Sequence, residues 1–143
     1  MLATIRMTGA FCDTVSGPIR RLKTIGLSCR TFAKPGLDLS FTILTDRPIG
    51  FAEVSLRRDY VNGCDTSPVA FLEGIYVEEA FRRQGVAALL VEQVTRWAID
   101  QGVSELASDA DIANLSSHRT HAALGFEETE RVVYFRRSLI PKR

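Results

Sequence analysis

The second half of the chain alternates strand-like and helix-like apolar patterns, and this order constrains the fold more than any other feature. Val69–Val77 is a long apolar run that predicts a strand. Residues 84–101 predict a helix, because apolar residues recur at helical spacing and Gly102 lies where a C-terminal cap belongs. Glu105–Ser108 predicts a short strand after it. A strand, a helix and a strand in this order indicate a parallel crossover.

Further patterns predict elements on both sides of this unit. Phe41–Leu44 and Ile49–Arg57 are half-apolar runs separated by turn formers, which is typical of an antiparallel hairpin. Asn114–Leu124 predicts a second helix, and Phe126–Arg137 predicts a closing strand. A hairpin combined with parallel crossovers predicts an α/β fold, with a mixed central sheet flanked by helices.

The long strand contains one residue that needs an explanation. A period of two places Phe71, Glu73, Ile75 and Val77 on one face. A carboxylate among apolar neighbours is costly unless it is paired, so Glu73 is either a functional acid or a member of a structural ion pair. Gly74 beside it predicts a bulge or a close backbone approach.

Length and charge limit the classes of function. The 143 residues fit a single domain, and 45% apolar with 24% charged residues is ordinary for a globular protein. Residues 1–40 carry a net charge of +4, which leaves −3 for the remainder, so a cationic small substrate is favoured. We expect no nucleic-acid partner, because no broad basic face accompanies stacking aromatic residues, and no membrane span, because the long apolar run that one needs is absent.

The cysteines and the first residues bear on location. Cys12, Cys29 and Cys64 are odd in number and include no CxxC pair, which argues against a disulfide framework or a metal site and favours a reducing cytoplasm. The first 34 residues are arginine-rich and acid-poor, as in an organellar transit peptide. The alternative is a poorly patterned N-terminal arm, in which Ile19–Ile25 forms a short helix.

A glycine-containing segment between the long strand and the first helix predicts an anion site. Free backbone N–H groups and the positive end of the helix dipole coincide there, and Gly85 lets an anion approach the backbone. These properties suit a pyrophosphate. The competing interpretation is a solvated turn that happens to contain two arginines.

The same segment resembles motif A of the GNAT acyltransferase superfamily, (Q/R)xxG(x)(G/A), at Arg82, Gly85 and Ala87. Leu124-Gly125-Phe126 is similar to the LGF that ends the last helix of that superfamily. The resemblance implies a sheet that splays near Gly74 and acetyl-coenzyme A as cosubstrate. The residues that it assigns to coenzyme binding are Ile75, Tyr76, Val77, Arg82, Arg83, Gln84, Gly85, Val86, Ala87, Ala88 and Asn114.

Longer strings resemble one family within this superfamily, the aminoglycoside 6'-N-acetyltransferases. They are Arg58-Asp59-Tyr60-Val61-Asn62-Gly63, Phe71-Leu72-Glu73-Gly74, Ala107-Ser108-Asp109 and residues 125–132. This resemblance covers about residues 47–137, whereas residues 1–46 lack a clear counterpart of the family's N-terminal helices. It implies a cationic aminoglycoside as substrate, bound by Tyr60, Glu73, Asp109 and Glu130, and a homodimer fits the family.

These residues predict direct acetyl transfer to a primary amine. Glu73, or alternatively Asp109, accepts the proton of the amine. His121 stands where many GNAT enzymes have a tyrosine that protonates the departing thiolate, although it also suits a structural role. Two alternatives stay open: acetylation of another primary amine, in a polyamine or a peptide, or a degenerate acyl-coenzyme A-binding module without turnover.

Overall fold

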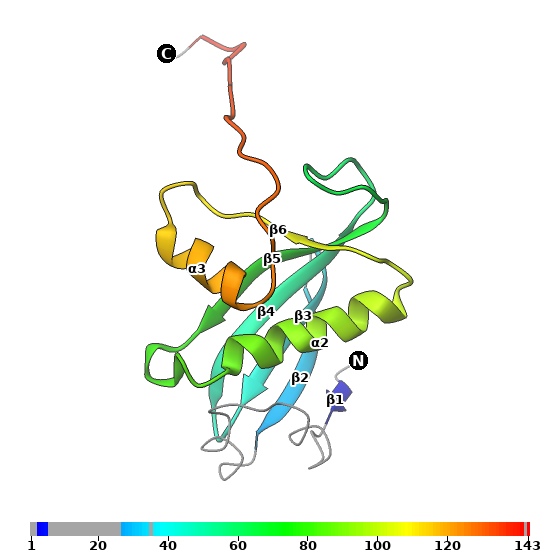
Figure 1. The fold of residues 1–143 in the computed structure, drawn as a ribbon, viewed down its shortest axis with the longest axis vertical. Coiled ribbons are helices and arrows are strands. Elements are labelled where there is room, and N and C mark those ends of the chain that lie inside the picture. Colours follow the sequence, from blue (N-terminus) through cyan, green and yellow to red (C-terminus); the bar gives the residue numbers. More distant parts are fainter. Residues whose placement is uncertain (1–2, 6–26, 35, 142) are drawn as a thin grey trace.

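A computed structural model describes residues 3–5, 27–34, 36–141 and 143, and these residues form one mixed sheet with helices (Figure 1). Neighbouring strands pair in the order β1-β2-β3-β4-β5-β6. The first four pairings are antiparallel, and β5 pairs with β6 in parallel. The prediction of a mixed sheet is therefore confirmed. The strands are β1 (Ala3–Ile5), β2 (Ser28–Lys34), β3 (Leu37–Leu44), β4 (Pro48–Arg57), β5 (Val69–Val77) and β6 (Leu106–Ser108).

Helix α2 (Val86–Asp100) lies across one face of the sheet and contacts β3, β4 and β5 (Figure 1). Its apolar stripe forms the main core with the facing strand residues, and Leu90 and Val94 are fully buried there. Gly102 adopts the left-handed conformation (φ 79°) that ends the helix, as predicted. A single 3-10 turn, η3 (Glu79–Phe81), precedes α2. None of the described helices is long and apolar enough to cross a membrane.

Strand β5 changes faces in its middle, because one extra residue interrupts its pairing with β4. Val54 pairs with Leu72 but Glu53 pairs with Gly74, so Glu73 is the bulged residue. Before the bulge, Phe71 belongs to a small cluster on the face away from α2. After it, Ile75 and Val77 pack against the core under α2. The prediction that these residues share one face was wrong, whereas the bulge predicted beside Gly74 is confirmed.

Strand β5 also separates from β6 at the same place. The parallel pairing runs from Ala70 with Leu106 to Leu72 with Ser108 and ends there. The sheet is therefore splayed from Glu73 onward, next to Gly74 as expected. The outer backbone edge of β5 beyond this residue faces the gap that β6 leaves.

The C-terminal segment differs from its prediction. Residues 126–137 form no strand, and the last part of this segment extends away from the fold (Figure 1). Val133, Tyr134 and Phe135 are 77%, 85% and 94% exposed. Their β propensity predicted a strand, but a strand also needs a partner edge, and none of the described strands pairs with this segment. The short helix expected at Ile19–Ile25 falls outside the described residues.

Candidate active site

The start of helix α2 has the geometry of an anion site. Gly85 is its N-cap, in the left-handed conformation (φ 86°, ψ 6°), and no side chain caps the helix there. The first helical hydrogen bond runs from the N–H of Leu89 to the carbonyl oxygen of Gly85 (3.1 Å), so the amides of Val86, Ala87 and Ala88 precede it. The first turn contains no acidic residue. A pyrophosphate site at Arg82–Ala88 stays a prediction, and these are the backbone features that it requires.

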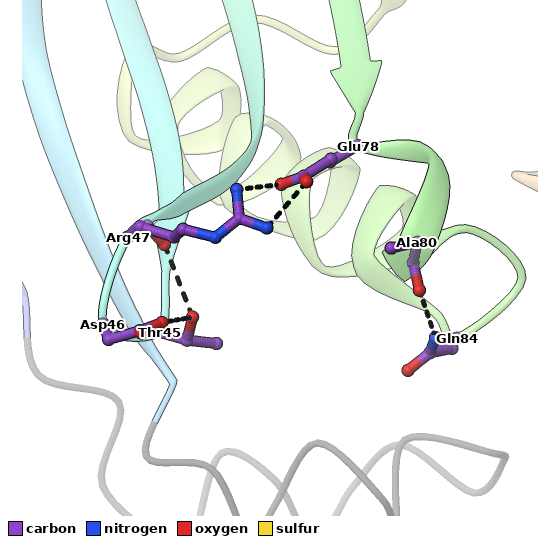
Figure 2. Close-up of polar contacts among 6 residues, drawn as sticks. All are labelled: Thr45, Asp46, Arg47, Glu78, Ala80 and Gln84. Atoms are coloured by element: carbon purple, nitrogen blue, oxygen red, sulfur yellow. Dashed lines mark hydrogen bonds and ion pairs between the residues drawn. The ribbon is translucent and has the colours of Figure 1, made fainter.

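Three side-chain contacts hold the segment that leads into this helix, and Figure 2 shows two of them, those of Arg47 and Gln84. Arg47, from the β3–β4 turn, forms two hydrogen bonds of 2.7 Å with the carboxylate of Glu78. Gln84 donates through Nε2 to the carbonyl oxygen of Ala80 (3.0 Å). Arg82 donates through Nε to the carbonyl oxygen of Val77 (2.9 Å), and its two terminal nitrogens take no part in this bond. The ion pair between Arg47 and Glu78 was not predicted from the sequence.

The remaining residues assigned to the coenzyme lie on β5 and at the start of helix α3 (Leu115–Ala123). Ile75, Tyr76 and Val77 pair with β4 on one side, and their other backbone edge faces the gap beside β6. Asn114 is the N-cap of α3, where its Oδ1 accepts a hydrogen bond from the N–H of Ser117 (3.0 Å). The oxygen of this side chain is thus used to cap the helix.

Glu73 is held by two side chains of strand β4. Ser55 donates its hydroxyl to Oε1. Arg57 donates through Nε to Oε1 (3.1 Å) and through Nη2 to Oε2 (2.8 Å). Partial burial raises the pKa of the Glu73 carboxyl, but these hydrogen bonds and the charge of Arg57 outweigh it and lower the pKa below its ordinary value. A carboxylate with a lowered pKa suits ammonium binding better than proton abstraction.

Arg57, the ion-pair partner of Glu73, also stacks on an aromatic ring. Its guanidinium carbon lies 3.4 Å from the centre of the Phe71 ring, a cation–π contact. Hydrogen bonding to Glu73 is the main cause that raises the pKa of Arg57, and the negative charge of Asp109 raises it further. Glu73 is thus in direct contact with the guanidinium, whereas Asp109 acts on it through its charge.

Tyr60 and Glu130 lie at the edge of this arrangement. Tyr60 is 76% exposed in the loop between β4 and β5. Glu130 is exposed in the C-terminal segment. The side chain of the preceding residue, Thr129, lies against Gly63 of the β4–β5 loop, where it would collide with a Cβ added to Gly63. In the part of the chain that the structure describes, neither residue forms a hydrogen bond or ion pair with Glu73 or Asp109.

Both ring nitrogens of His121 are engaged. Nε2 lies 2.9 Å from the hydroxyl oxygen of Ser108, and Nδ1 lies 2.8 Å from the carbonyl oxygen of Ser117. The Ser108 hydroxyl also lies 3.3 Å from the carbonyl oxygen of Leu72, at the point where β5 leaves β6. The Phe126 ring and the imidazole pack in a T-shaped arrangement, with 5.2 Å between ring centroids. His121 therefore bridges α3 and β6 in this structure.

The chain is similar to known proteins at two levels, a family and a group of enzymes within it. Residues 22–126 match the model of the acetyltransferase (GNAT) family, and the chain belongs to that family. Within it, the chain is closely related to aminoglycoside N(6')-acetyltransferases of type 1. The enzyme of Serratia marcescens is 63% identical over 108 residues, which cover 76% of this chain and 69% of the relative. That of Salmonella typhimurium is 54% identical over 99 residues, 68% of each chain.

Solved structures agree with this assignment. AAC(6')-Iy in complex with the bisubstrate analog CoA-S-monomethyl-acetylneamine is 52% identical, with a TM-score of 0.68 over 70% of this chain and 69% of that one. AAC(6')-Ih from Acinetobacter baumannii is 35% identical, with a TM-score of 0.70 over 97% and 99%. Both resemblances noted in the sequence are thus confirmed, and the fold is the GNAT fold.

Proposed function

We propose that this protein transfers the acetyl group of acetyl-coenzyme A to the 6'-amine of an aminoglycoside antibiotic and thereby confers resistance. The observation that carries the proposal is the close relationship to aminoglycoside N(6')-acetyltransferases, one of them 63% identical. The geometry supports it, because Glu73 lies where β5 leaves β6, and Asp109 directly follows the last residue of β6. AAC(6')-Iy, a relative with a solved structure, was obtained in complex with CoA.

In this proposal the chain supplies binding and orientation, and acetyl-coenzyme A supplies the activated acetyl group. The amides at the start of α2 bind the pyrophosphate, together with the helix dipole. The free backbone edge at Ile75–Val77 pairs with the pantetheine arm. An amide of the same strand near Gly74 stabilises the negative charge that develops on the acetyl oxygen when the amine attacks.

The acidic residues have two roles toward the polycationic substrate: they bind its ammonium groups, and one of them accepts a proton. Glu73 and Asp109 bind ammonium groups of the aminoglycoside, with Glu130 and Tyr60 at the rim. An amine must lose a proton before it can attack, and Glu73 or Asp109, directly or through water, accepts it. The lowered pKa of Glu73 favours Asp109 for this step.

His121 is the candidate acid for the departing thiolate. Its replacement by Ala should then slow turnover mainly at high pH, where proton donors are scarce. Because both of its nitrogens are engaged, a structural bridge is the competing interpretation. Lower stability of the variant with an unchanged pH–rate profile would identify the bridge.

The substrate is tested with aminoglycosides that carry either an amine or a hydroxyl at the 6' position, with release of the coenzyme A thiol as the readout. Turnover of the 6'-amino compounds alone is expected. Turnover of a polyamine or a peptide instead would assign a different amine. Calorimetric binding of acetyl-coenzyme A without turnover of any amine would identify a non-catalytic binding module.

The acidic residues are tested by separate kinetic effects. A residue that only binds ammonium groups contributes equally to ground and transition states, so Glu130→Gln should mainly raise KM, by roughly tenfold or about 1.4 kcal/mol. Loss of the proton acceptor should mainly lower kcat, on the order of 10²–10⁴-fold, and we expect this for Asp109→Asn. The same loss confined to Glu73→Gln would move the base to Glu73, and small equal effects of all three would refute the anionic site.

We further propose that the enzyme is a cytoplasmic homodimer. The free thiols of Cys29 and Cys64 suit a reducing compartment. The exposed, β-prone segment around Val132–Phe135 extends from the fold without a strand partner in the described part of its own chain, which suits pairing with a second copy. Light scattering should give twice the chain mass, and a monomer would refute the dimer.

A further inference from the structure

The number of hydrogen bonds already made by Glu73 limits what this residue can offer to a substrate. An ionised carboxylate has about four lone-pair positions. Oε1 accepts from Ser55 and from Nε of Arg57, and Oε2 accepts from Nη2 of Arg57. One acceptor position therefore remains, on Oε2, and its direction is fixed by the two donors on β4.

Arg57 is itself held on two sides. Its guanidinium lies over the Phe71 ring, 3.4 Å from carbon to ring centre, and Phe71 is only 4% exposed. A planar guanidinium that is stacked on a buried ring and bonded through two nitrogens has little freedom to rotate. Glu73, as the bulged residue of β5, lacks the regular strand pairing that would otherwise orient it. The orientation of its carboxylate thus depends on Arg57 and Ser55.

We propose that Arg57 is a specificity-determining positioning residue, which directs the single remaining acceptor position of Glu73 toward one amine of the polycation. This inference rests on the proposed function and deepens it. The charge of Arg57 cancels that of Glu73, so the pair acts as a directional acceptor. The net negative charge that attracts the substrate then comes from Asp109 and Glu130.

This arrangement predicts an unusual separation of kinetic constants. Arg57→Ala frees two acceptor positions and makes the site more negative, so the polycation should bind as well or better, but with its amine misplaced. A misplacement of about 1 Å costs on the order of 100-fold in rate, so kcat should fall by roughly 10- to 100-fold while KM stays unchanged or falls. Arg57→Lys keeps the charge but loses the fork of donors, so KM should match the wild type while kcat stays low.

The experiment is steady-state kinetics of wild type, Arg57→Ala, Arg57→Lys and a matched control with one 6'-amino aminoglycoside. The control is Arg58→Ala, which removes the same charge from the neighbouring, exposed residue and should leave kcat unchanged. Circular dichroism and the thermal midpoint show whether each variant is folded. If Arg57→Ala misfolds, Arg57→Lys alone decides, because the proposal requires its kcat to be low at normal KM.

The outcomes separate this inference from the function on which it rests. Wild-type protein without aminoglycoside turnover would refute the function and the inference together. Normal wild-type turnover with unchanged kcat in both Arg57 variants would refute the inference alone. So would a rise in KM at unchanged kcat, since that would make Arg57 a simple binding contributor. A lower kcat at equal or lower KM, with Arg58→Ala normal, supports the proposal.

Discussion

Gly50 lies where helix α2 packs closely against the sheet, and its replacement by alanine tests this packing. A Cβ at Gly50 would lie 2.9 Å from the carbonyl oxygen of Tyr76, 3.2 Å from Cγ1 of Val86 and 3.4 Å from Cδ1 of Leu90. Val86 and Leu90 are at most 1% exposed, so neither has room to turn away. The carbonyl belongs to the β5 backbone, which cannot rotate out of the way either.

The sign of the stability change follows from two opposing effects. Alanine is better than glycine inside a strand by about 0.5–1 kcal/mol, because it loses less backbone entropy on folding. Overpacking of a rigid core costs about 1–3 kcal/mol. We therefore expect Gly50→Ala to lower the free energy of unfolding by about 1–2 kcal/mol, and the thermal midpoint by roughly 3–8 °C.

The change should also affect coenzyme binding, because Val86 is the first residue of α2 and its amide belongs to the proposed anion site. Urea unfolding and calorimetry with coenzyme A measure the two effects, and we expect weaker binding as well as lower stability. Gly102→Ala is the control, since Gly102 ends the same helix with φ 79° and no atom within 4 Å of an added Cβ. It should cost stability through backbone strain and leave coenzyme affinity unchanged. A Gly50→Ala protein as stable as wild type, with normal affinity, would refute the packing argument.

Two further changes probe the anion site and the core. Gly85→Asp should abolish coenzyme binding in a folded protein, because it sets a negative charge against the pyrophosphate, while Gly85→Asn, which tolerates φ 86°, should retain part of the affinity in calorimetry. Burial raises the pKa of the Cys29 thiol from 9.0 to about 11. The unfolded chain therefore ionises first as pH rises, and stability should fall between about pH 9 and 11, by at most about 2–3 kcal/mol. Urea unfolding at both pH values should show no such loss in Cys29→Ala.

Local patterns predicted the elements that rely on local interactions. The hairpin strands β3 and β4, the long strand β5 and both helices were predicted within a few residues of their observed bounds. Asn114 was predicted as the first residue of a helix and is the N-cap of α3. The start of α2 at Val86, two residues later than predicted, reflects the left-handed conformation of Gly85, which breaks the helical hydrogen-bond pattern.

The partners of Glu73 were beyond the reach of local patterns, because they depend on strand register. Ser55 and Arg57 are spaced two apart on β4, so they share a face, but only the bulge decides that Glu73 joins them. The sequence nevertheless contained a signal for these partners. Ser55 and Arg57 lie two residues apart on the strand predicted before the one that contains Glu73. The C-terminal strand failed for a related reason: propensity describes the segment alone, whereas a strand requires a second edge.

The single extra residue in β5 links the fold to the proposed chemistry. Without it, an unbroken period of two would keep Ile75 and Val77 on the face of Phe71, away from α2, and the core under the anion site would lose two apolar side chains. With it, those side chains enter the core, while the Glu73 carboxylate keeps its hydrogen bonds with Ser55 and Arg57. The pairing with β6 ends one residue earlier, at Leu72, so the same irregularity lies where the free edge begins. Core packing, the free edge of β5 and the directed carboxylate therefore depend on one position in the chain.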